Sequence, residues 1–161
     1  MSSCLPARRL PNRRAFLAQV CAWPAAMALA RPALAGVTRF FETNNGAIAG
    51  FDPVAYFTEG RAVKGTLGHA LRWRAANWYF ASESNLAAFE MDPDAYAPQY
   101  GGYCAYAMTM GQLVPSQPEA FTLFRNRLYL TENFEVRDLW RQDIGPHVAV
   151  ADVNWSRVAP R

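Results

Sequence analysis

Cysteine and histidine are scarce in this sequence, with three cysteines and two histidines among 161 residues. Cys-x-x-Cys, His-Glu-x-x-His and the phosphate-binding Gly-rich loop are all absent, and so is an ordered Ser, His and Asp set. The acidic residues are scattered, and Asp92 and Asp94 resemble first-turn acids of a helix rather than a catalytic pair. The sequence offers no pattern for a catalytic centre, which makes an enzyme the less favoured class.

Long apolar runs are also missing. The only candidate is Ala15 to Ala30, which Gln19 and Pro24 interrupt and which is too short and alanine-rich for a comfortable membrane span of ~20 apolar residues. Arg13 and Arg14 lie directly before this run, and Phe16 and Leu17 lie at its start. Together the four residues form the pattern of twin-arginine (Tat) export. Ala33-Leu34-Ala35 then supplies a small-x-small cleavage site before Gly36. We therefore predict a Tat-type signal peptide over 1–35, with an uncleaved N-terminal anchor as the alternative.

An excess of positive charge is lacking once this segment is removed. Residues 1–35 hold five of the 16 basic residues and no acid, so 36–161 carry 11 basic and 13 acidic residues, a formal net charge of −2. Nucleic-acid binding thus loses its electrostatic basis. We expect a periplasmic domain over 36–161, exported folded by the Tat machinery and not membrane-spanning, while the oligomeric state is left open.

Only one cysteine, Cys104, remains after residue 35, so an intrachain disulfide is excluded even in an oxidising compartment. Stability must then come from the core, a ligand or oligomerisation. Aromatic residues are plentiful, and they supply a small domain with a large buried area. They include Trp73, Trp78, Trp140 and Trp155.

Two β-hairpins and four or five short helices are expected. Leu71 to Arg74 alternates apolar and charged residues and precedes a returning strand at Trp78-Tyr79-Phe80. A second hairpin is predicted at 121–130, with Asn126 available for a positive φ in its turn. This pattern predicts a small single α+β domain with antiparallel sheet pieces.

Helix boundaries are marked by capping residues and by turn residues. Asp52, Ser82, Asp92 and Thr131 are predicted N-caps. A helix is expected over 103–110, and the last helix is expected to turn Val150, Ala151, Asn154 and Trp155 inward. Gly101-Gly102 is expected to permit a close approach of two backbones.

The combined motifs resemble the YHS domain family, in its exported branch. The motifs that carry the resemblance span about 50–155 and are Gly50 to Phe57, Trp78 to Ser82, Phe89, Asp92-Pro93 and Tyr96 to Ala105. The resemblance implies a YHS-like fold and an association with heavy-metal handling. The classical metal-binding cysteines of the family correspond to Ala55 and Ala81 here, so a thiolate site at those positions is not carried over.

Cys104 and Met108 are the best candidate ligands for a metal ion. At i and i+4 of a helix they would project from one face, and thiolate with thioether suits Cu(I). A third ligand would have to come from His69 or His147, and simple core packing of the pair is the alternative. A second constellation is Tyr96, Tyr100, Tyr103 and Tyr106, which could line an aromatic pocket or build the core.

Three functions are consistent with these features. The first is an exported binding module, for a soft metal such as copper, with Cys104 central. The second is a non-enzymatic module that contacts or assembles with another protein. The third is a redox or small-molecule enzyme that uses Cys104 as its nucleophile, which requires an accessible thiol of lowered pKa.

Overall fold

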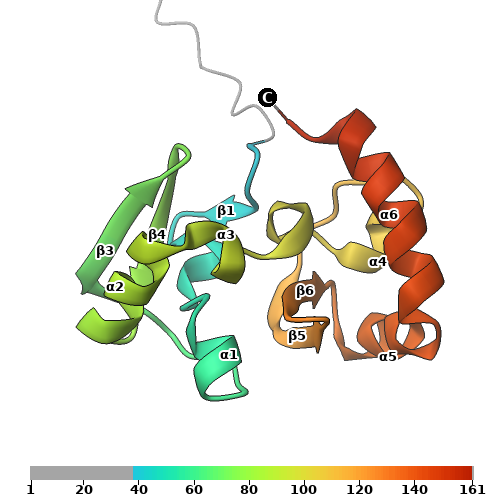
Figure 1. The fold of residues 1–161 in the computed structure, drawn as a ribbon. Helices are drawn as coiled ribbons and strands as arrows, with labels where there is room; N and C mark the ends of the chain where they lie inside the picture. Colours follow the sequence, from blue (N-terminus) through green and yellow to red (C-terminus); the bar gives the residue numbers. More distant parts are fainter. Residues whose placement is uncertain (1–37, 161) are drawn as a thin grey trace, which may run out of the picture. The chain divides into compact units, whose positions relative to one another are not determined.

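The computed structural model describes residues 38–160, and the predicted signal segment 1–35 lies outside this range (Figure 1). The strands of this part are β1 (Glu42–Thr43), β2 (Gly46–Ala47), β3 (Thr66–Trp73), β4 (Ala76–Phe80), β5 (Gln117–Phe124) and β6 (Arg127–Thr131). Its α-helices are α1 (Ala55–Thr58), α2 (Glu83–Met91), α3 (Pro93–Tyr96), α4 (Ala105–Met108), α5 (Phe134–Gln142) and α6 (Ile144–Val158). Two short 3-10 turns are η1 (Ile48–Gly50) and η2 (Gln99–Gly102). The α+β class is thus confirmed.

The two predicted hairpins are present, and each closes through two residues. In β3–β4, Trp73 pairs with Ala76 across Arg74 and Ala75, whose φ values are 47° and 68°. The β5–β6 hairpin has the same form, with φ of 50° and 56° at the two central residues, and the second of these is the expected Asn126. Turns with two positive φ values match the twist of the flanking strands.

A third hairpin, β1–β2, adds to the two that were predicted. Its strands have two residues each, and only its turn, Asn44 and Asn45, left a signal in the sequence. Strands this short show no alternation, so pattern analysis cannot detect them.

Of the four predicted helix caps, two are confirmed and two are wrong. The N-cap of α1 is Val54 rather than Asp52. Ser82 accepts the Asn85 N–H at 3.2 Å, and Asp92 accepts the Ala95 N–H at 3.2 Å. Thr131 does not cap α5. It is buried at the end of β6, where its hydroxyl donates to the Ala120 carbonyl at 2.8 Å, and Asn133 caps the helix instead.

Two further helical expectations need correction. The helix expected over 103–110 is a single turn, because Cys104 lies outside helical geometry with ψ of 115°. In α6, Ala151 is buried and Asn154 bonds to the Met108 and Thr109 carbonyls, but Val150 is 49% exposed. Val150 precedes Ala151 by one residue, about 100° around the helix, and so faces away from α4.

The core consists of two clusters that share strand β6. Trp78 is fully buried at the centre of the larger cluster, where Phe89 and Phe40 lie 5.3 and 5.0 Å from it between ring centres. Trp140 is fully buried in the second cluster. Successive residues of a strand face opposite sides, so Leu128 and Leu130 join the first cluster and Tyr129 joins the second.

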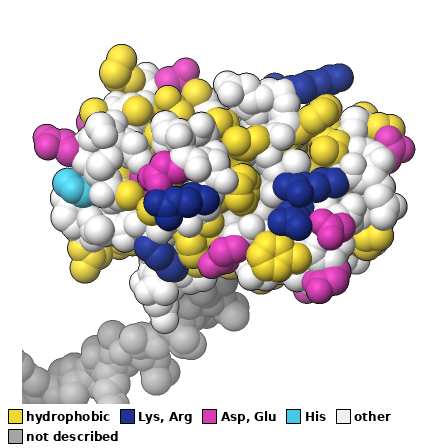
Figure 2. Space-filling view, turned by 90° about the horizontal axis from the view of Figure 1, so that it is seen from below, with side chains coloured by type: hydrophobic (Ala, Val, Ile, Leu, Met, Phe, Trp, Pro, Cys, Tyr) yellow, Lys and Arg dark blue, Asp and Glu magenta, His cyan; other side chains and the backbone are white. Residues whose placement is uncertain are grey.

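Charged side chains of both signs are interspersed with apolar ones on the face shown in Figure 2, and neither sign covers a continuous area there. Within 38–160, no helix combines the length and apolarity needed to cross a bilayer.

Candidate functional site

The Cys104 sulfur is enclosed and already engaged. The residue is 1% exposed, and its Sγ accepts the Ala107 N–H at 3.5 Å, so the side chain caps the first turn of α4. Met108 is fully buried one turn later, and its N–H donates to the Cys104 carbonyl at 3.1 Å. The two residues thus share one turn, but Cys104 is the non-helical N-cap and not the helical residue that the i, i+4 spacing predicts, and both lie in the interior.

The two histidines lie on different parts of the fold. His69 belongs to β3, which is at the opposite end of the described domain from α4 and α6 (Figure 1). His147 is on α6, stacked on the Trp140 ring with 5.5 Å between ring centres, and its Nδ1 lies 3.1 Å from the Trp140 carbonyl oxygen. No three of the described His, Cys, Asp and Glu residues form a group that could hold a metal ion.

The four tyrosines do not converge on one pocket. The Tyr100 hydroxyl donates to Asp152 at 2.9 Å, whereas the Tyr103 hydroxyl donates to the Thr38 carbonyl at 2.8 Å. Tyr96 packs edge-on against Phe57 and Tyr106 against His147. Burial raises the pKa of both Tyr100 and Tyr103, so these hydroxyls stay protonated as donors. Each ring serves a different contact.

Positions 55 and 81, where the YHS resemblance places cysteines, meet at one buried carboxylate. Asp52 is fully buried, and its Oδ1 accepts the Val54 and Ala55 N–H groups at 2.8 and 3.3 Å. Its Oδ2 accepts the Ala81 N–H at 2.8 Å and the Asn85 side-chain amide at 2.7 Å. Four donors occupy both oxygens, so this carboxylate joins α1, β4 and α2 and has no capacity left for a ligand.

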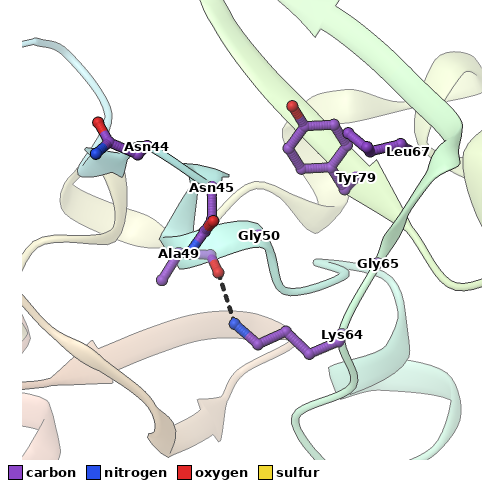
Figure 3. Close-up of a pocket in the computed structure, with 8 residues that line it drawn as sticks. All are labelled: Asn44, Asn45, Ala49, Gly50, Lys64, Gly65, Leu67 and Tyr79. Carbon is purple, nitrogen blue, oxygen red and sulfur yellow. Dashed lines mark hydrogen bonds between the residues drawn. The ribbon is translucent and has the colours of Figure 1, made fainter.

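An open pocket of about 440 Å³ lies elsewhere, beside the β1–β2 turn (Figure 3). We call it the Lys64 pocket, and its lining is Asn44, Asn45, Ala49, Gly50, Lys64, Gly65, Leu67 and Tyr79. Its volume is in the range of small-molecule sites. None of these residues was singled out as a ligand in the sequence, where Asn44 and Asn45 marked only a turn.

One wall of the Lys64 pocket is strained main chain. Ile48, Ala49 and Gly50 have φ of 44°, 55° and 77° in succession. A left-handed conformation costs a residue with a Cβ roughly 1–2 kcal/mol, and a β-branched residue such as Ile48 rarely adopts it. The side chain of Ile48 is fully buried in the larger core cluster, and this packing holds the strained segment in place.

The pocket has a cation at one side and apolar surface at the other. The Lys64 ammonium donates to the Ala49 carbonyl at 2.8 Å and lies 3.9 Å from the centre of the Phe51 ring. Leu67 and the Tyr79 ring lie next to each other across the pocket (Figure 3). Gly46 allows the Tyr79 ring to approach the β1–β2 turn, because a Cβ there would lie 2.5 Å from the ring.

The enclosed thiol leads to a prediction on its reactivity. In the folded chain, Cys104 should react with iodoacetamide about 100-fold or more slowly than in urea, because α4 must open first. Mass spectrometry of the peptide that contains Cys104 would measure this separately from Cys4 and Cys21. Equal rates in the two conditions would contradict an enclosed sulfur and would favour thiol chemistry.

Comparisons of this chain with protein-family models, with curated proteins and with solved structures find no match.

Proposed function

We propose that this chain is an exported, non-catalytic binding module with a YHS-like domain, and that it holds a small organic anion in the Lys64 pocket. Export is supported by Arg13, Arg14 and the Ala33-Leu34-Ala35 cleavage pattern, and the domain type by the motifs over 50–155. The binding role is supported by the pocket itself.

The observation that carries the proposal is the strained wall of the pocket. Left-handed residues persist only where the surrounding structure imposes them, and they concentrate at ligand clamps and active sites. Here the strain lies in Ile48 and Ala49, next to the one cation of the pocket lining. The strained segment turns the Ala49 carbonyl toward Lys64 and so fixes the position of the ammonium group.

The ligand class follows from the charges and surfaces of the lining. Lys64 is its only charged residue, and no carboxylate of the described residues lies within ion-pair distance of it. An ammonium has three donors, and Ala49 occupies one of them. A carboxylate would take the remaining donors, while Tyr79 and Leu67 would cover an apolar body of the ligand.

Sodium benzoate is a suitable probe, because it joins a carboxylate to a flat apolar ring. We expect it to shift the amide resonances of Gly50, Gly65 and Tyr79 in ¹⁵N-labelled full-length chain. Lys64→Gln should weaken binding about tenfold or more, because a charge-assisted hydrogen bond is lost. Benzamide, which has the same ring and no charge, should bind the wild-type chain correspondingly more weakly.

Arg61→Gln is the matched control, since Arg61 is an exposed nearby cation that pairs with Glu59 and does not line the pocket. It should leave benzoate affinity unchanged. Equal losses in the two variants would show a general charge effect and would contradict a site at Lys64. Shifts confined to residues outside the pocket would contradict it as well.

Soft-metal binding at Cys104 is the second candidate, and it is favoured by the placement of Cys104 and Met108 on one turn. Copper uptake there would have to break the Sγ cap of α4 and recruit a further ligand. The alkylation experiment bears on this candidate too, because a protected thiol is closed to a metal unless α4 opens.

A further inference from the structure

A second cavity, of about 280 Å³, lies between the β5–β6 turn and α6. It is separate from the Lys64 pocket and shares no lining residue with it. Its lining combines two cations, one carboxylate and an apolar surface. Phe124, Arg125, Arg127, Val148 and Asp152 are among the residues that line it.

The hairpin turn presents the two arginines. Arg125 is held in the left-handed conformation, with φ of 50°, and its guanidinium carbon lies 5.1 Å from the centre of the Phe124 ring. Arg127 follows two residues later, at the start of β6. Neither guanidinium has a carboxylate within ion-pair distance among the described residues, so both retain donors for a ligand.

A hydrogen bond from a buried tyrosine holds the carboxylate of Asp152 in position. Tyr100 is a buried residue with 3% of its surface exposed, and its hydroxyl donates to Asp152 Oδ1 at 2.9 Å. Burial raises the pKa of Tyr100, and the hydrogen bond to Asp152 raises it further, so the hydroxyl remains a donor at any physiological pH. Asp152 Oδ2 has no hydrogen-bond partner among residues 38–160 and remains available to a ligand.

We propose that this cavity binds a free α-amino acid with an apolar side chain. A guanidinium matches a carboxylate through two parallel hydrogen bonds, which assigns the ligand's carboxylate to Arg125 and Arg127. Asp152 would accept the ammonium group, and Phe124 and Val148 would contact the side chain. A plain anion would lie against Asp152 and a plain cation against the arginines, so a zwitterion fits the charges best.

L-Leucine and two derivatives test this assignment in the folded full-length chain by calorimetry or NMR titration. N-acetyl-L-leucine lacks the ammonium group, and L-leucinamide lacks the carboxylate. We expect leucine to bind, and each derivative to bind about tenfold or more weakly, because each loses one charge-assisted contact.

Asp152→Asn gives a second comparison and keeps an oxygen for the Tyr100 hydroxyl. In this variant leucine and N-acetyl-L-leucine should bind with equal affinity. In Arg127→Gln the difference in affinity between leucine and leucinamide should become smaller. Asp138→Asn is the control, because Asp138 is an exposed acid on α5 that pairs with Arg137 outside the cavity.

Three results would overturn the proposal. Equal binding of N-acetyl-L-leucine and leucine to the wild-type chain would leave only an anion site. Equal binding of leucinamide and leucine would leave only a cation site. Failure of leucine to bind would remove the site altogether.

Discussion

Replacing Asp52 with alanine is expected to lower the free energy of unfolding by about 3–5 kcal/mol. The carboxylate is fully buried and accepts four hydrogen bonds, from Val54, Ala55, Ala81 and Asn85. Its removal leaves these donors in the interior without partners, and each unsatisfied group costs about 1–3 kcal/mol unless the site relaxes. Urea unfolding of the full-length chain would measure the change.

Asp52→Asn separates the charge from the hydrogen bonds. The new amide nitrogen would face two donors, the Ala81 N–H and the Asn85 side chain, so we expect a loss of about 2–3 kcal/mol. Asp92→Ala is the matched control, since Asp92 is an exposed cap with one side-chain bond, and it should cost ~1 kcal/mol. An effect of Asp52→Ala no larger than this control would show that Asp52 does not organise the fold.

Replacing Gly101 with alanine is expected to cost about 2–4 kcal/mol. A Cβ at this position would lie 2.0 Å from the Arg39 carbonyl oxygen, and φ is +63°. The two backbones are also bonded, because the Phe41 N–H donates to the Gly101 carbonyl at 2.8 Å. Relief of the clash would therefore pull residues 39–41 away from η2, which unfolding in urea would detect as lower stability.

Gly60→Ala is the control for backbone strain. Gly60 has a similar φ of +66°, but nothing lies within 4 Å of an added Cβ. This variant should cost only the roughly 1–2 kcal/mol of a left-handed alanine. The difference between the two variants isolates the contact with Arg39, and equal losses would mean that this contact adjusts without cost.

Local signals predicted much of the fold. The two long hairpins, the caps at Ser82 and Asp92, and the close approach at Gly101 all depend on residues a few positions apart or on one residue's own geometry. Predictions failed where a distant contact competed with a local signal. Thr131 has the chemistry of a cap, but the Ala120 carbonyl on the neighbouring strand engages its hydroxyl.

The candidate sites were less accessible from the sequence. Cys104 and Met108 were identified by their spacing, and they do share one turn, but their burial depends on what packs around that turn. The sequence did not predict the Lys64 pocket, although Gly46 precedes its strained wall and Gly50 belongs to it, and both could have suggested left-handed backbone there. Nothing in the sequence pattern relates Arg127 to Asp152.

The sequence by itself therefore determined the two long hairpins, the α+β class and the absence of an intrachain disulfide in 36–161, because these depend on neighbouring residues and on composition. Only the tertiary structure decided that Asp52 is buried among four donors and that Lys64 faces Leu67 and Tyr79 across a pocket. Those arrangements join residues from separate elements, and their energies come from burial and from the pairing of charges and hydrogen bonds, which exist only after the chain has folded.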